Sequence, residues 1–209
     1  MDMPARMNDL IRTTLRERSR LAGACTIAAG LLLAASAAQA QVQRSFVNLG
    51  FEQPNLQTAG CRGYIGDSFV PRWTTNHPAF GQQNVGGCVA PPGFIAGDPA
   101  PIIELWRTPR SGVDARSGLQ LAELNAEVVS RISQNVCLES GEQVNWSFSH
   151  RGRNSSTVQD VMEFLVGSSP IVRVGTTSTG AGGVITTNQG SGGSAAGPNG
   201  WRDYSGAFA

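Results

Sequence analysis

The residues Val144–His150 alternate strictly between two kinds of side chain. The even positions carry Val, Trp, Phe and His, and the odd positions carry only Asn and Ser. A period of two is typical of a β-strand that packs one face on a core and exposes the other to water. Turn-forming residues precede this segment at 139–142 and follow it at 151–155. The pattern predicts an all-β chain, an antiparallel β-sandwich built around this strand.

Other apolar runs bounded by turn residues predict further strands. These runs span residues 45–52, 101–106, 119–126, 128–138, 161–166 and 171–174. Leu121, Leu124 and Val128 also lie at helical spacing, so an amphipathic helix is the alternative for residues 119–129. We expect the β-sandwich domain to span residues 41–174.

Two stretches predict long loops. Residues 56–100 are rich in Gly and Pro, and so long a loop in a compact domain is usually functional or held by a covalent link. Residues 175–200 are rich in Gly, Ser and Thr, and their apolar surface is too small to offset the entropy of ordering. We expect them to form a mobile loop or linker. Residues 201–209 predict the start of a terminal strand that is incomplete, as in a truncated chain.

The N-terminal residues have the order of a secretory signal peptide. A basic segment at 12–20 precedes an apolar run at 21–38, which closes on Ala38-Gln39-Ala40. The competing interpretation is a retained membrane anchor, because the apolar run is about long enough to span a bilayer. Cleavage after Ala40 predicts one exported domain, secreted, periplasmic or at the cell surface of a bacterium, without stable membrane insertion.

Charge and motifs disfavour several function classes. The chain has 16 Lys and Arg residues against 15 Asp and Glu residues, with a formal net charge of +1. This balance gives no reason to expect a nucleic acid or an anionic surface as a partner. No nucleophile elbow, zinc-protease motif or phosphate-binding glycine loop is present, so an enzyme is disfavoured.

Three cysteines follow the predicted cleavage site: Cys61, Cys88 and Cys137. A disulfide is expected in an exported protein. Cys61 and Cys88 lie in the same Gly/Pro-rich region, which makes them the predicted pair. Cys137 is then either a buried free thiol or the partner of a cysteine beyond this chain.

Five short motifs follow one another along the chain. They are Asn48-Leu49-Gly50-Phe51-Glu52, Trp73-Thr74-Thr75, Ile103-Glu104-Leu105-Trp106, Ala122-Glu123-Leu124-Asn125-Ala126 and Trp146-Ser147-Phe148-Ser149-His150-Arg151-Gly152-Arg153. In this order they resemble the galactose-binding-like jelly-roll domains of bacterial secreted and cell-surface proteins, akin to carbohydrate-binding modules. The resemblance covers residues 48–167 and weakly the tail from Trp201. It implies a jelly roll that serves as a binding module without naming the ligand.

Polar residues near strand ends are the first candidates for a ligand site. His150, Arg151 and Arg153 can hold sugar hydroxyls or a carboxylate. His150 also continues the core-facing register of its strand, so a histidine that caps the edge of the core is the alternative.

Glu104 and Glu123 lie within otherwise apolar strands, where a carboxylate needs a partner. Three arrangements are possible for the two carboxylates: ion pairs with Arg151 or Arg153, side chains that point outward, or a polar pocket shared with Asn125 and Arg151. A glycosidase pair is a further alternative, which requires a fixed separation across a cleft.

Two aromatic and two polar residues complete the candidates. Trp73 and Trp106 can stack on a pyranose ring, and a packing role is the alternative for each. Asn48 and Glu52 resemble the position at which related jelly rolls hold a structural calcium ion, whose hard oxygen ligands they could supply. Ordinary turn chemistry is the alternative there. No other cofactor is expected.

Together these observations predict an exported, non-catalytic module that binds glycan or another cell-surface ligand, in an adhesion or envelope system. The alternatives are a glycoside hydrolase that uses Glu104 or Glu123, and a structural or adhesion module whose edge strand pairs with a partner chain. The sequence does not indicate the oligomeric state.

Overall fold

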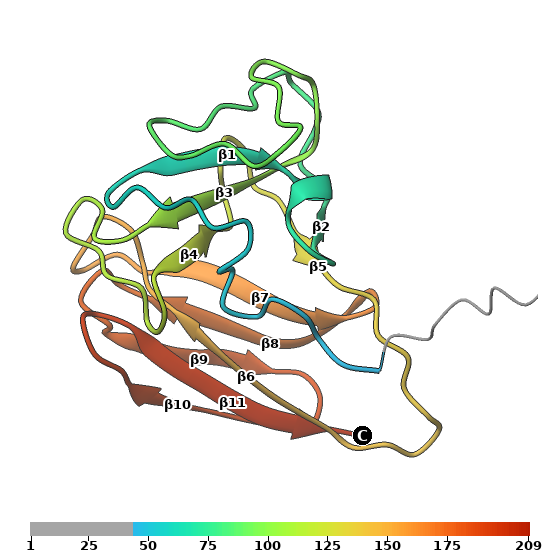
Figure 1. Ribbon diagram of the computed structural model, residues 1–209. Coiled ribbons are helices and arrows are strands. Elements are labelled where there is room, and N and C mark those ends of the chain that lie inside the picture. The colour runs from blue at the N-terminus through green and yellow to red at the C-terminus, as the bar shows by residue number, and fades with distance from the viewer. Residues whose placement is uncertain (1–43) are drawn as a thin grey trace, which may run out of the picture. The chain divides into compact units, whose positions relative to one another are not determined.

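The computed structural model describes residues 44–209, so the predicted signal peptide, residues 1–40, lies outside the described residues. The strands are β1 Arg62–Gly66, β2 Thr74–Thr75, β3 Ile102–Arg107, β4 Gln120–Glu123, β5 Ile132–Ser133, β6 Val144–His150, β7 Asp160–Val166, β8 Ser169–Thr176, β9 Gly182–Thr187, β10 Ser191–Ala196 and β11 Arg202–Phe208 (Figure 1). A short 3-10 helix, Asp67–Phe69, follows β1, and no α-helix occurs in residues 44–209. All strand pairs are antiparallel, which confirms the predicted all-β antiparallel fold. The described part of the chain holds no helix of the length and apolar character that a bilayer crossing needs.

Two three-stranded sheets enclose one hydrophobic core. Their strand orders are β10-β11-β6 and β7-β8-β9. Trp146 from β6, Val172 and Val174 from β8, and Tyr204 and Phe208 from β11 are all buried in this core. The even positions of β6 therefore face inward as the alternation predicts, while Asn145 and Ser147 are exposed. This pair of sheets is the sandwich that the sequence indicated.

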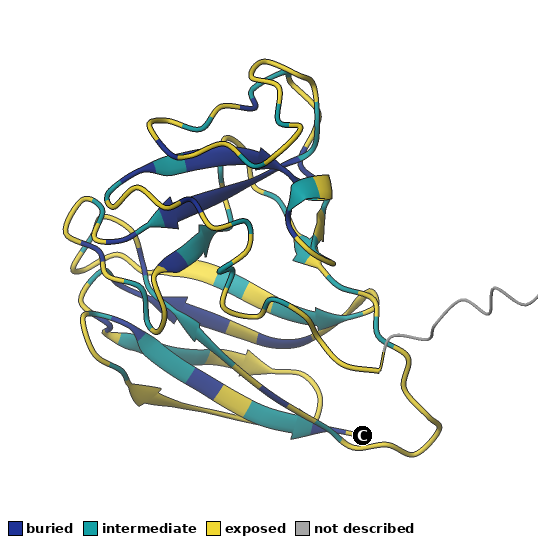
Figure 2. Cartoon of the chain, viewed as in Figure 1, coloured by how far each residue is buried: buried dark blue, intermediate teal, exposed yellow. Residues whose placement is uncertain are grey.

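A second core lies behind the sheet of order β1-β3-β4. Ile65, Ile103 and Leu105 from β1 and β3 pack there with Leu56 and with the two bridged cysteines. Figure 2 shows β1 and β3 in dark blue along most of their lengths, in contrast to the exposed β10. The alternate residues of β1, β3 and β4 leave this core and carry the polar side chains of the candidate site.

The prediction of one long loop over residues 56–100 is wrong, because it contains β1, the 3-10 helix and β2. The sequence of β1, Arg-Gly-Tyr-Ile-Gly, has low strand propensity because two of its five residues are glycine. Pairing with β3 along its whole length stabilises it instead, and Tyr64 exchanges backbone hydrogen bonds with Asn84 on its other side. A contact made by residues distant in sequence therefore overrides local propensity.

The prediction of a first strand at residues 45–52 is also wrong. Asn48 and Phe51 have φ angles of 54° and 56°, which are incompatible with an extended strand. The Asn48 side chain accepts a hydrogen bond from the Gln53 backbone N–H and donates one to the Gln53 carbonyl. This local pairing closes the segment into a turn.

Residues 119–138 contain less strand than expected. β4 ends at Glu123, and residues 128–138 contribute only the two-residue β5. The Ser130 hydroxyl donates to the Leu124 carbonyl, so the chain turns between the two short strands. The alternative helix does not form either.

The prediction of a mobile loop at residues 175–200 is wrong, because this segment forms the end of β8 and the strands β9 and β10. β10 pairs with all of β11 except its last residue, and β11 pairs with all of β6. The segment 201–209 is thus a central strand with a neighbour on each side. Residues 202–208 are ordered by backbone pairing with β10 and β6 and by the packing of Tyr204 and Phe208 in the core with Trp146.

Gly206 in β11 makes room for the Trp146 indole. A Cβ atom on Gly206 would lie 2.4 Å from Trp146 Cζ2 and 1.9 Å from the Ser191 carbonyl oxygen. On Gly192 it would lie 3.5 Å from the same Trp146 atom, whereas on Gly193 it would meet nothing within 4 Å. The packing of Trp146 therefore requires a glycine at position 206 of β11.

We expect Gly206→Ala to lower the free energy of unfolding by about 1–3 kcal/mol, because the extra methyl group overpacks the core. Gly193→Ala is the matched control in the adjacent strand and is expected to change that free energy by less than about 0.5 kcal/mol. Urea denaturation of both variants checks the difference. Equal effects would contradict the packing role of Gly206.

Candidate functional site

Glu104 and Glu123 lie directly opposite each other on neighbouring strands. β3 and β4 pair Glu104 with Glu123, and β1 places Tyr64 on the other side of Glu104. Residues opposite each other in an antiparallel pair have Cβ atoms about 4.5–5.5 Å apart. The Glu104 side chain is 0% exposed and that of Glu123 is 16% exposed. The strand register thus brings two carboxyl groups together in a largely buried place.

Each of these carboxyl groups has one oxygen with donors and one without. Glu104 Oε1 accepts a hydrogen bond from Trp106 Nε1 at 2.7 Å and from an Arg62 guanidinium nitrogen at 3.4 Å. Glu123 Oε1 accepts one from Arg153 at 2.9 Å. The two Oε2 atoms are buried and have no hydrogen-bond donor in the described part of the chain.

Burial raises the pKa of the Glu104 carboxyl above its ordinary value, although the Trp106 hydrogen bond and three guanidinium groups oppose the shift. Burial also raises the pKa of Glu123, and the negative charge of Glu104 adds to that increase. Burial and the hydrogen bond with Glu127 raise the pKa of Tyr64 to about 12. All three shifts favour the protonated form.

Trp106 is covered by two arginines. The guanidinium carbons of Arg153 and Arg110 lie 5.2 Å and 5.5 Å from its ring centroid. Trp106 is only 4% exposed. The face of the Trp106 ring is therefore occupied by cations. Of the two roles predicted for Trp106, packing and sugar stacking, the structure favours packing, and the indole also donates a hydrogen bond to Glu104.

The predicted polar cluster divides into separate places. Glu104, Glu123, Trp106 and Arg153 come together, and the Arg153–Glu123 ion pair is one of the predicted alternatives. Arg151 instead donates to the carbonyls of Asn199 and Gly152. In residues 44–209 no hydrogen bond or ion pair joins Arg151 to either carboxylate. Asn125 is exposed in the turn after β4.

His150 lies at the end of β6, half-buried, with Nδ1 at 2.9 Å from the Thr176 hydroxyl. Thr176 in turn contacts the Tyr204 hydroxyl at 2.7 Å in the sandwich core. Burial lowers the pKa of His150, so the neutral imidazole is favoured. These contacts place His150 in a structural chain of hydrogen bonds.

Trp73 lines an open pocket of about 330 Å³ that the carboxylate cluster does not share. The other lining residues are Asp67, Ser68, Val70, Arg72, Thr74 and Asn135. The Trp73 indole N–H donates to the Asn48 carbonyl at 3.0 Å, and its ring stacks on Phe51 with centroids 4.8 Å apart. These two contacts fix the indole while leaving it half-buried.

The polar side chains of this pocket differ in whether they already form hydrogen bonds within the protein. Asp67 Oδ2 accepts a hydrogen bond from the Thr75 backbone N–H. The side chains of Arg72 and Asn135 are exposed and make no hydrogen bond or ion pair within residues 44–209. Hydrogen-bonding groups therefore remain available beside a fixed aromatic ring.

A larger hollow of about 630 Å³ lies over the outward face of the β10-β11-β6 sheet. Its charged groups are Arg116 and Asp203, which form a two-pronged ion pair with distances of 2.9 Å and 2.7 Å. Ser149 also donates to Asp203 at 2.6 Å. The Arg116 and Ser149 hydrogen bonds lower the pKa of Asp203. Because both Asp203 oxygens already have donors, this hollow offers a ligand less than the Trp73 pocket does.

The residues predicted to hold calcium are engaged with the backbone. Glu52 Oε1 accepts hydrogen bonds from the backbone N–H groups of Leu119 and Gln120 at 2.8 Å and 3.0 Å. The Asn48 side chain pairs with Gln53. Within residues 44–209 no group of three or more His, Cys, Asp or Glu residues is arranged to hold a metal ion.

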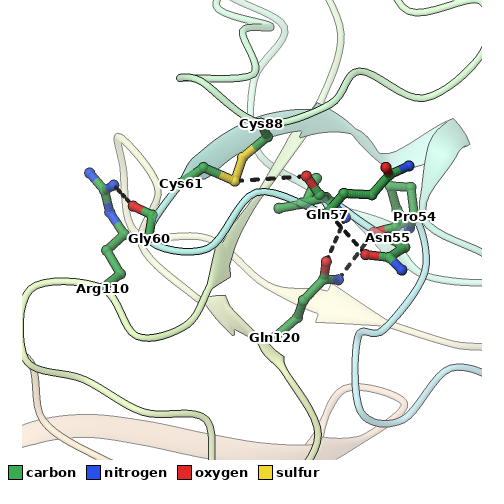
Figure 3. Close-up of a disulfide and its surroundings, with 9 residues drawn as sticks. Pro54, Asn55, Gln57, Gly60, Cys61, Cys88, Arg110 and Gln120 are labelled. Carbon is green, nitrogen blue, oxygen red and sulfur yellow. Dashed lines mark hydrogen bonds between the residues drawn. A yellow bond between two sulfur atoms is a disulfide. The ribbon is translucent and has the colours of Figure 1, made fainter.

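The predicted disulfide between Cys61 and Cys88 is confirmed, with Cα atoms 5.2 Å apart. Figure 3 shows it beside Gln120, whose side chain accepts a hydrogen bond from Leu56 N–H and donates to the carbonyls of Phe51 and Pro54. The bridge joins the residue just before β1 to the loop that holds Cys88. Cys137 forms no disulfide and is exposed, so the prediction of a buried thiol is wrong.

The sequence indicated Arg153 beside the carboxylates but did not indicate Arg62, Arg110 or Tyr64, and it indicated Trp73 but not the other residues of the Trp73 pocket. Arg62 and Tyr64 lie on β1, which was assigned to a loop, and their two-residue spacing was the available sign of a shared strand face. Asn135 reaches the Trp73 pocket from a segment about sixty residues away in sequence. Only the tertiary structure could bring these residues together.

No family model matches this chain, and neither a curated protein nor a solved structure matches it.

Proposed function

We propose that this chain is an exported, non-catalytic β-sandwich module that binds glycan, with the pocket beside Trp73 as its ligand site. The disulfide and the predicted signal peptide support export, because disulfides persist in oxidising compartments. The motif resemblance to galactose-binding-like jelly rolls supports a binding role. The secreted, periplasmic or cell-surface location belongs to the same proposal.

The observation that carries the proposal is the composition of the Trp73 pocket. An indole face suits the apolar face of a pyranose ring, and carboxylate, guanidinium and amide groups suit its hydroxyls. Asp67, Arg72 and Asn135 supply these three groups around Trp73. The volume of about 330 Å³ lies at the lower end of the range for small-molecule sites. One sugar residue, or the end of a chain, is the size of ligand that fits.

The experiment is a glycan array with the processed protein, residues 41–209, followed by calorimetry on each hit. We expect Arg72→Ala and Asn135→Ala each to weaken binding about tenfold, the loss of one or two hydrogen bonds. Both side chains are exposed, so neither substitution disturbs the core. Trp73→Ala should abolish measurable binding, while Trp73→Phe should retain part of it because an aromatic face remains.

The control variant is Asn145→Ala, an exposed residue on β6 outside both hollows. It should bind each hit as the wild type does. An array without any ligand, or hits whose affinity is unchanged by all three alanine substitutions in the pocket, would contradict the proposal.

The geometry favours this binding module over the alternative glycoside hydrolase. A glycosidase needs both carboxyl groups to reach the sugar across a cleft. Glu104 is completely buried, and its Oε1 atom is engaged by Trp106 and Arg62. The third alternative, an adhesion module that pairs by an edge strand, stays a prediction that light scattering at several concentrations checks.

A further inference from the structure

We propose that Glu104 and Glu123 share a single proton, so that they act as one proton-binding site and make the stability of the β1-β3-β4 sheet depend on pH. This inference does not depend on glycan binding. It concerns a buried pair that lies outside the Trp73 pocket.

Glu104 and Glu123 each have one buried carboxylate oxygen without a donor within residues 44–209. Glu104 and Glu123 are directly opposite each other in an antiparallel register, so their side chains leave the sheet on the same face. Both Oε2 atoms are buried without a donor in the described residues, whereas both Oε1 atoms have donors. Two buried acceptors without donors are costly, since each loses its hydrogen bonds to water.

Five charged or titratable groups surround the Glu104–Glu123 pair. They come from β1, from the residues after β3 and β4, and from the β6–β7 connection: Arg62, Tyr64, Arg110, Glu127 and Arg153. Arg62 and Arg153 bind the Oε1 atoms. Arg110 donates to the Gly60 carbonyl and lies over Trp106. Tyr64 is hydrogen-bonded with Glu127.

None of these groups therefore supplies a donor to either Oε2 atom. A proton bound to one carboxyl group supplies the missing donor, because the O–H of that group can donate to the Oε2 atom of the other group. The proton comes from solvent, no other bond changes, and the pair then carries one negative charge where it would otherwise carry two. This arrangement removes the repulsion between neighbouring carboxylates, as in other pairs that titrate as a unit.

The pKa directions agree with this geometry, since burial raises both values and the negative charge of Glu104 further disfavours ionisation of Glu123. A carboxyl with a raised pKa binds more protons in the folded state than in the unfolded state. Its contribution to stability is then complete below the unfolded pKa of about 4.3 and is lost as pH rises through the folded value. Alkaline pH should weaken the sheet and loosen the Arg153 contact.

The test is a carbon-13 NMR titration of the glutamate carboxyl groups in the processed protein. We expect one titration step above the ordinary glutamate value of about 4.3. Glu123→Gln should remove this step, because its amide can donate permanently to Glu104 Oε2 while its oxygen still accepts from Arg153. Glu104→Gln is the reciprocal variant and should also remove it.

Glu163→Gln is the control, since Glu163 is an exposed residue of β7 whose ion pair with Arg173 is long, at 3.9 Å. This variant should keep the high step. The shared proton is disproved if no glutamate titrates above the ordinary range, or if the step survives in Glu123→Gln, which would assign it to burial of Glu104 alone. Loss of the step on adding calcium chloride to the wild type would identify a cation site and also overturn the proposal.

A second measurement covers the case in which chemical shifts are hard to assign. His150, whose pKa is lowered, makes stability rise with pH in this range, and it does so equally in the wild type and in Glu123→Gln. Between about pH 5 and about pH 8 the urea midpoint of the wild type should therefore fall relative to that of Glu123→Gln. Equal changes in the two proteins would count against a shared proton.

Discussion

Replacing Trp146 with alanine is expected to lower the free energy of unfolding by about 4 kcal/mol, which is typical of removing a buried aromatic residue. Trp146 is 7% exposed in the core between the two sheets of the sandwich. Its ring centroid lies 5.5 Å from that of Phe148 and 5.4 Å from that of Phe164. Alanine would remove these contacts and leave a cavity against Gly206, which has no side chain to fill it.

Urea denaturation followed by circular dichroism measures this loss. Trp146→Phe is the matched control and should cost much less, because it keeps an aromatic ring and removes an indole N–H that is buried without a partner in the described residues. A loss below about 1 kcal/mol for Trp146→Ala would mean that the ring is not packed as the structure has it.

Removing the disulfide is expected to lower the free energy of unfolding by about 3.5 kcal/mol on the chain-entropy model. Cys61 and Cys88 are separated by 27 residues, so the bridge restricts a loop of intermediate length in the unfolded chain. Both cysteines are also part of the buried core behind the β1-β3-β4 sheet. A double substitution of Cys61 and Cys88 with alanine tests this expectation without creating a new free thiol.

The matched control is Cys137→Ala, because Cys137 is exposed and forms no disulfide. Its free energy of unfolding should stay within about 0.5 kcal/mol of the wild type. Reduction of the wild type with a small thiol should reproduce the loss in the double variant. Wild-type stability that does not respond to reduction would contradict a structural role for the bridge.

The candidate site could be predicted only in part. A carboxylate within an apolar strand needs a partner, and this rule correctly singled out Glu104 and Glu123 and offered Arg153 as a partner. It could not indicate that the two carboxyl groups face each other, because the offset between β3 and β4 depends on how the intervening turn closes. Trp73 and Trp106 looked equivalent in sequence. Two arginines cover Trp106 while Trp73 lines a pocket, and sequence spacing encodes neither fact.

What the sequence determined by itself is the character of its strongly patterned strand. β6 has the predicted bounds, its inward face carries the predicted residues, and the loop cysteines pair as expected, because these outcomes depend on side-chain alternation and on proximity along the chain. Only the tertiary structure decided β1 and β10, whose glycine-rich sequences have little intrinsic strand preference. The order of β1 comes from backbone hydrogen bonds to β3, which is distant in sequence, and that of β10 comes from its hairpin with β11, which in turn pairs with β6. Such contacts form only in the folded chain, so no local sequence pattern indicates them.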